Sequence, residues 1–387
     1  MNSVRKTLLA LLILGGLSPE LAAQVDAATR PKVLVIATGG TIAGVQQEPG
    51  GIGGYRAGTL TAEQIVASVP SLARYAQVEV EQFSNVASTL ITPEQWVMLS
   101  RRINAVLAER SDLAGVVVTH GTDRLEETAF FLYLTVRSEK PVVVVGAQRP
   151  ATGLSPDGPI NLLSAVRTAA SPQAVGKGAL VVMDDRILSA RESRKHYQRV
   201  GGFDGGEMGM LGVVASNGPE FFFTPVRRHG TASEFDLAGV TTLPTVDLVF
   251  SYPGGEGRTY ATNPAGIVIS STGFTCAEQA SYQALARSGV QLVTAFPSGD
   301  NVNGGGSANP ENRASAATAG ASVPSDSLPN SMRESCAELV RTGALRGPIV
   351  SPVAVQHLTP QKARILLMLA LTRTRDRREI QRYFNTY

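Results

Sequence analysis

The stretch VLVIATGGTIAG, residues 33–44, decides the fold, because an uninterrupted apolar strand runs directly into a turn of glycines and threonines. A second stretch, GVVVTHGTDRLEETAFFL at residues 115–132, repeats the pattern and continues into a helix. Strands that are apolar along their whole length are typical of a parallel sheet covered by helices on both faces. The two stretches therefore predict an α/β domain whose strands end in polar turns.

Further apolar runs alternate with helical patterns along the first half of the chain. The expected strands are 32–37, 78–83, 114–119, 141–146 and 179–183, and the expected helices are 93–110, 126–136 and 161–170. Thr92 as N-cap and Pro93 at the first helical position mark the clearest helix start. This alternation predicts a doubly wound α/β domain over residues 31–223.

The pattern changes at residues 224–243, which mix charges, Gly and Pro without periodicity and are interpreted as a linker. Alternation then resumes and predicts a smaller C-terminal α/β domain over residues 244–387. Its expected strands are 246–251, 266–270 and 290–295, and its expected helices are 276–287, 361–374 and 378–387. Residues 298–327, rich in Gly, Asn, Ser, Pro and Ala, are expected to form a loop or insertion.

Composition narrows the function. The 387 residues carry 35 Lys and Arg against 32 Asp and Glu, a net charge of +3 that gives no electrostatic case for nucleic acid. The two cysteines, Cys276 and Cys336, either pair in an oxidising compartment or stay buried as small apolar residues. The four histidines lack ligand-like spacing, so no metal is expected.

Residues 1–27 are typical of a signal peptide. A basic start, MNSVRK, precedes an apolar run at 7–17 and small residues at 21–27. The run is shorter than the roughly 18 residues that span a bilayer. An uncleaved anchor is the alternative. The sequence therefore predicts a periplasmic or secreted protein that has no membrane contact after cleavage.

The two polar turns place Thr41, Thr122 and Asp123 at the carboxyl ends of strands, where open α/β sheets bind ligands. Each turn alone could also be structural, with Thr41 or Asp123 capping a helix. Two hydroxyls and a carboxylate in one crevice suit acyl transfer on a small substrate that carries an amine. The motifs GxSxG, GxxxxGK[ST], HExxH and GxGxxG are absent. His120 is a weaker candidate base, because adjacent side chains on a strand point to opposite faces.

ATGGTIAG (37–44) and THGTDRLEETAFFL (119–132) resemble the two signature motifs of the bacterial type II L-asparaginase family, which includes glutaminase-asparaginases. Segments 149–170, 179–195 and 360–387 also look like that family, so the resemblance covers about residues 31–295 and 345–387. It implies an asparaginase-like fold and cofactor-free hydrolysis of L-asparagine, with L-glutamine as a further substrate, through a threonine acyl-enzyme. It also implies a homotetramer with sites at subunit interfaces. The alternative is a catalytically impaired periplasmic amino-acid-binding protein of the same fold.

The resemblance also implies roles for individual residues. Thr41 resembles the nucleophile and Tyr55 the loop tyrosine beside it. Thr122, Asp123 and Lys195 resemble the second threonine, the acid that binds the substrate ammonium and the lysine behind it, and Ser88 resembles a serine that grips the substrate carboxylate. The backbone N–H groups of Gly40, Gly121 and Thr122 are the natural oxyanion donors. Lys195 or Tyr55 could take a threonine proton only if its pKa fell from ~10 toward neutral. Which threonine attacks first stays open.

The sequence also departs from the family pattern. The family contributes an acidic residue, and often an Asn, from a partner's smaller domain, but residues 270–278 contain no Asn. Asp300, Glu311 and Glu256 are the candidates for the acid. Ala87-Ser88-Thr89 replaces a more polar family pattern. These departures bear on substrate preference and efficiency.

Overall fold

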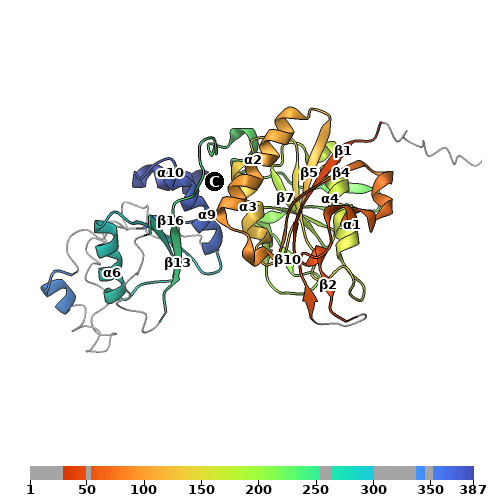
Figure 1. Cartoon of the computed structure of the whole chain (residues 1–387). Coiled ribbons are helices and arrows are strands. Elements are labelled where there is room, and N and C mark those ends of the chain that lie inside the picture. The colour runs from red at the N-terminus through yellow and green to blue at the C-terminus, as the bar shows by residue number, and fades with distance from the viewer. Residues whose placement is uncertain (1–28, 49–53, 253–263, 300–336, 345–351) are drawn as a thin grey trace, which may run out of the picture.

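The computed structural model describes residues 29–48, 54–252, 264–299, 337–344 and 352–387 (Figure 1). The predicted signal peptide and most of the predicted loop at 298–327 lie outside these residues.

The larger domain is built on an eight-stranded mixed sheet in the order β12-β11-β8-β7-β6-β5-β1-β4. Its parallel strands are β1 (Lys32–Gly39), β4 (Gln77–Val86), β5 (Leu113–Thr119), β6 (Val142–Val145) and β7 (Ala179–Met183). These strands confirm the predicted ones. The antiparallel edge, which the sequence analysis did not predict, consists of β8 (Arg186–Ser189), β11 (Met210–Ala215) and β12 (Gly218–Phe221).

Helices cover both faces of this sheet, as the apolar strands predicted. They are α1 (Ala62–Ala67), α2 (Pro93–Glu109), α3 (Leu125–Thr135) and α4 (Gly158–Ala169). Figure 1 shows α2 and α3 on the side of the smaller domain and α4 on the opposite side. The start of α2 follows the predicted rule, because Thr92 and Gln95 form a reciprocal capping box.

Short elements complete the larger domain. They are η2 (Thr41–Ala43), β2 (Val45–Gln46), β3 (Tyr55–Arg56), η3 (Pro70–Arg74), η4 (Ser88–Leu90), η5 (Pro172–Ala174), β9 (Arg194–Lys195), β10 (Phe203–Asp204) and α5 (Gly206–Gly209). A further short helix, η6 (Gly230–Ala232), lies in the segment at 224–243.

The smaller domain confirms the predicted second α/β unit. Its parallel sheet has the order β13-β14-β15-β16. The strands are β13 (Val246–Phe250), β14 (Gly266–Ser270), β15 (Gln291–Ala295) and β16 (Val353–Ala354), and the helices are α6 (Cys276–Arg287), α9 (Pro360–Leu371) and α10 (Arg377–Thr386). Cys276 is disulfide-bonded, and Cys336 lies outside the described residues.

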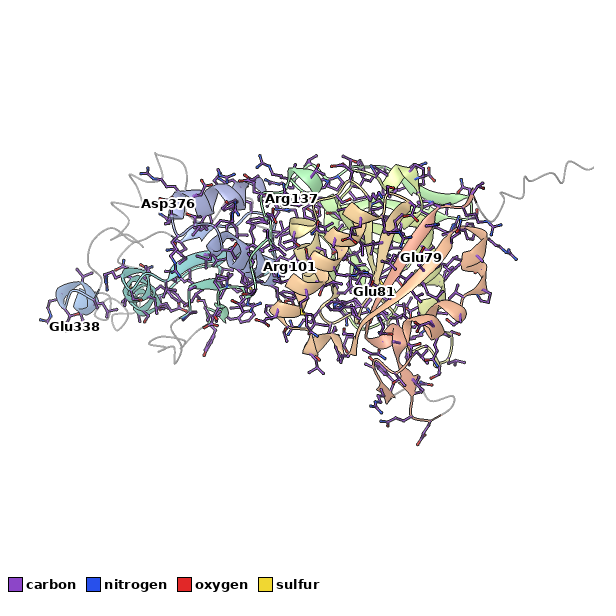
Figure 2. The ribbon with its side chains drawn as sticks, turned by 45° about the horizontal axis from the view of Figure 1, so that its top comes forward. Glu79, Glu81, Arg101, Arg137, Glu338 and Asp376 are labelled. Atoms are coloured by element: carbon purple, nitrogen blue, oxygen red, sulfur yellow. The ribbon has the colours of Figure 1, made fainter. Side chains whose placement is uncertain are left out.

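The segment at 224–243 packs against both domains. Its Phe235 is buried and its ring centroid lies 4.9 Å from that of Tyr387. Arg101 on α2 donates to the Leu237 carbonyl at 2.7 Å, and Arg137 pairs with Asp236 at 3.0 Å; Figure 2 labels both arginines. Helix α9 contacts α3 on one side and β13 and β14 on the other. The two sheets are thus joined through packed helices. Within the described part of the chain, no helix is long and apolar enough to cross a membrane.

Candidate active site

The two polar turns predicted from the sequence touch each other. Strand β1 lies between β4 and β5, and Ala37 pairs with Thr119 in register, so the turns after both strands leave the same edge of the sheet. Gly40 has φ 85°, and a Cβ there would lie 2.2 Å from the Gly121 Cα. A Cβ on Gly121 would in turn lie 2.8 Å from the Ser88 Oγ. Glycine at both positions therefore permits three chain segments to meet at one point.

Thr41 lies directly after this contact, in η2. Its side chain is buried, and its Oγ1 lies 2.7 Å from the hydroxyl of Tyr55. Tyr55 belongs to the β2–β3 hairpin, where it pairs with Gln46, and it is 41% exposed. The predicted pair of Thr41 and a loop tyrosine is therefore in hydrogen-bond contact, with the tyrosine on the solvent side.

The second predicted group is also brought together. The Lys195 Nζ lies 2.8 Å from the Thr122 Oγ1 and 2.6 Å from the Asp123 Oδ1. The Lys195 side chain is 12% exposed, whereas that of Asp123 is 50% exposed. Lys195 lies on strand β9. The backbone N–H of Lys195 donates to the Glu126 Oε2 at 2.8 Å, and this hydrogen bond connects the strand to the start of α3. The ammonium thus donates to a hydroxyl and a carboxylate whose outer face is open.

The three predicted oxyanion donors differ in whether their N–H groups already have a hydrogen-bond acceptor in the protein. The Gly40 N–H donates to the Val86 carbonyl at 2.9 Å, so the structure does not support Gly40 as an oxyanion donor. Among the described residues, the Gly121 and Thr122 N–H groups have no hydrogen-bond partner. These two N–H groups are therefore the remaining candidates for oxyanion donors.

His120 has a structural contact that the sequence analysis missed. It is fully buried, and burial lowers its pKa to about 4. Trp96 Nε1 donates to the Thr128 Oγ1 at 2.8 Å, and that hydroxyl lies 3.0 Å from the His120 Nε2. A carbonyl oxygen can only accept, so the Gly121 carbonyl fixes the ring hydrogen on Nδ1, and Nε2 of the neutral ring accepts from the Thr128 hydroxyl. Nδ1 therefore carries the hydrogen and donates to the Gly121 carbonyl at 2.8 Å. His120 holds the peptide whose N–H belongs to Thr122.

A polar cavity of about 330 Å³ opens beside these groups, lined by Asp123, Lys195, Glu126, His196 and, from the smaller domain, Gln361. It lies on the side of the site that carries the exposed Asp123 carboxylate. The three candidates for a partner's acid, Asp300, Glu311 and Glu256, lie outside the described residues. In the described segments, no cluster of three or more His, Cys, Asp or Glu side chains could hold a metal ion.

Comparison with known proteins places this geometry in a family. The family model described as "Asparaginase, N-terminal" matches residues 32–227. The chain is 37% identical to L-asparaginase 2 of Bacillus subtilis (strain 168), over 92% of this chain and 87% of that protein. It is 36% identical to the glutaminase-asparaginase of Pseudomonas fluorescens biotype A, over 100% of both chains. The crystal structure of a probable cytoplasmic L-asparaginase from Campylobacter jejuni is similar, with a TM-score of 0.75 at 31% identity, covering 92% of this chain and 100% of that chain. The motifs, the two-domain fold and these similarities agree: the chain belongs to the asparaginase family.

Proposed function

We propose that the protein is an amidohydrolase that converts L-asparagine to L-aspartate and ammonia, with L-glutamine as the second candidate substrate. The observation that carries the proposal is the meeting of two threonine turns, one with Tyr55 2.7 Å from Thr41 and one with Lys195 2.8 Å from Thr122. Relatives named L-asparaginase and glutaminase-asparaginase support the two substrates. They do not favour the alternative of a binding protein without catalysis.

We assign Thr41 as the nucleophile. A threonine hydroxyl needs a neighbour that takes its proton, and the Tyr55 oxygen is placed to accept one. An ammonium donates hydrogen bonds and cannot accept a proton, so the Lys195 ammonium serves Thr122 as a donor that stabilises negative charge on its oxygen. The two threonines therefore have different partners and different tasks.

The proposed reaction has two halves. The Thr41 Oγ1 attacks the side-chain amide carbon while its proton passes to the Tyr55 oxygen and the Tyr55 hydroxyl proton passes to the amide nitrogen. The carbonyl oxygen becomes an oxyanion that accepts from the Gly121 and Thr122 N–H groups. The oxyanion then collapses, the C–N bond breaks, and the protonated nitrogen departs as ammonia, which leaves a Thr41 ester. Water attacks that ester by the same route, which releases aspartate and restores the hydroxyl.

Substrate recognition uses the remaining groups. Asp123 presents a half-exposed carboxylate, which suits the α-ammonium of an amino acid through a charge-assisted hydrogen bond. Ser88 lies against Gly121 and offers its hydroxyl to the α-carboxylate. In this proposal the 330 Å³ cavity, which Asp123 lines, lies on the α-ammonium side of the substrate.

The proposal extends to location and assembly. Residues 1–27 direct export to the periplasm or medium, residues 31–223 form the catalytic domain, and residues 224–243 link it to residues 244–387. Four copies assemble, and an acid from a partner's smaller domain completes the ammonium side of each site. The open outer face of Asp123 supports this assignment, since a single exposed carboxylate leaves room for a second acidic group.

The test is ammonia release by the purified mature protein with L-asparagine, with L-glutamine and without substrate. The proposal expects catalytic release from L-asparagine above the blank. Stoichiometric binding of L-asparagine by calorimetry without ammonia release would favour the binding-protein alternative.

A further inference from the structure

Lys362 is a buried cation outside the reacting groups. It lies in the first turn of α9, in the smaller domain, and only 1% of it is exposed. Burial lowers the pKa of Lys362 to about 8, and Glu126 and Glu192 partly oppose that shift. A buried charge is costly unless its hydrogen bonds are satisfied, so the hydrogen-bond partners of the Lys362 ammonium indicate its structural role.

The ammonium of Lys362 is satisfied by backbone carbonyls of one segment. Its Nζ lies 3.0 Å from the carbonyl oxygen of Ala190, 2.8 Å from that of Arg191 and 2.5 Å from that of Ser193. These contacts use all three donors of an ammonium. No strand ladder pairs these carbonyls, because residues 190–193 form the connection between β8 and β9.

The 190–193 connection leads directly into β9, the strand that carries Lys195. Strand β9 begins at Arg194, directly after the last carbonyl that Lys362 binds, and it is only two residues long. Glu126 fixes the Lys195 N–H from the other side at 2.8 Å. The position of the Lys195 side chain, 12% exposed and shared between Thr122 and Asp123, thus depends on a short strand anchored at both ends.

We propose that Lys362 is a positioning residue for Lys195. From the smaller domain it binds three carbonyls of the 190–193 connection, and it thereby fixes the position of the Lys195 Nζ relative to Thr122 and Asp123. The inference rests on the proposed role of Lys195 in the reaction. If Lys362 has this role, the contact between α9 and the larger domain positions a catalytic side chain in addition to burying apolar surface.

A double-mutant cycle separates positioning from general stability. Lys362→Met keeps the apolar stem and removes the three donors. We expect it to lower kcat for L-asparagine by roughly 10- to 100-fold, the scale of a displaced catalytic group, with KM changed less than about threefold. In a Lys195→Met background the same substitution should lower the residual kcat by less than about twofold, because the group that it positions is already gone.

Arg364→Met is the matched control. Arg364 lies on the same helix, and its Nε donates to the Val246 carbonyl at 2.7 Å, within the smaller domain. We expect it to lower the melting temperature without changing kcat more than about threefold. If Lys362→Met does not fold, Lys362→Arg is carried through the same cycle, with a smaller loss of kcat and again none in the Lys195→Met background.

The two possible failures are distinguishable. An equal fold-loss of kcat from the Lys362 substitution in both backgrounds, or full activity of folded Lys362→Met, would overturn the positioning role. Near-wild-type activity of folded Lys195→Met would instead overturn the proposed mechanism.

Discussion

Gly121→Ala tests the convergence of the two turns most sharply, because the structure gives the size of the disturbance. The added Cβ would lie 2.8 Å from both the Cβ and the Oγ of Ser88 and 3.1 Å from the Cα of Gly40. Carbon atoms in contact prefer about 3.5–4.0 Å, so the segments must separate by roughly 0.7–1.2 Å. Overpacking of this kind costs about 1–3 kcal/mol of stability, which a folded domain of this size tolerates.

The same displacement should also lower the rate of the reaction. A displacement of ~1 Å at a reacting centre lowers the rate by roughly 100-fold, which corresponds to about 2.7 kcal/mol of activation free energy. Ammonia release from L-asparagine gives kcat/KM, and urea unfolding gives the stability. Folded Gly121→Ala with kcat/KM within about threefold of the unmodified protein would refute the reasoning.

Three further predictions concern recognition, acid stability and assembly. Asp123→Asn should cost on the order of 2–5 kcal/mol in kcat/KM for L-asparagine but little for N-acetyl-L-asparagine; equal losses would show that Asp123 does not bind the ammonium. His120 is buried and neutral with a pKa of about 4, below its value in the unfolded chain. Because the unfolded chain binds more protons below pH ~6.5, the free energy of unfolding should fall by about 3 kcal/mol as the pH drops from ~6.5 to ~4. Urea titrations at several pH values should show a weaker pH dependence of that free energy for His120→Asn, and an unchanged dependence would contradict this prediction. Co-refolded mixtures of Thr122→Val with the triple variant Asp300→Ala, Glu311→Ala and Glu256→Ala should regain activity; confirmed mixed oligomers without activity would argue against a shared site.

Long apolar strands were the most predictable part of the fold. Runs such as residues 142–145 and 179–183 are apolar throughout and fully buried, and a strand buried on both faces can be recognised in the sequence by its uninterrupted apolar residues. The antiparallel edge was missed because β8 and β12 are short and carry Arg186 and Glu220. Turn residues could have revealed it. Asp184 and Asp185 have φ 53° and 59° in the β7–β8 turn. Ser216 and Asn217 form the turn between β11 and β12, and Gly218 begins β12; an Asn-Gly pair between apolar runs is a strong hairpin signal.

Local motifs predicted the site where the chemistry lies within or next to a turn. The contacts of Thr41 with Tyr55 and of Thr122 with Lys195 agree with the predicted groupings. Hydrogen bonds between distant segments were predictable only where the family resemblance supplied them, as for Thr122 and Lys195. The occupied Gly40 N–H depends on how β4 ends at Val86, and the role of His120 depends on Trp96 and Thr128 from two different helices. Periodicity reports burial but not which buried polar groups meet.

The most direct test of the central claim is turnover of L-asparagine by Thr41→Ala and Thr122→Val beside the unmodified protein. Ammonia and aspartate are both quantified, and circular dichroism and melting temperature confirm folding. We predict equal amounts of the two products from the unmodified protein and a loss of at least about 100-fold in kcat for each variant, the scale of losing a positioned catalytic group. Folded Thr41→Ala or Thr122→Val protein with near-wild-type turnover would contradict the two-threonine site.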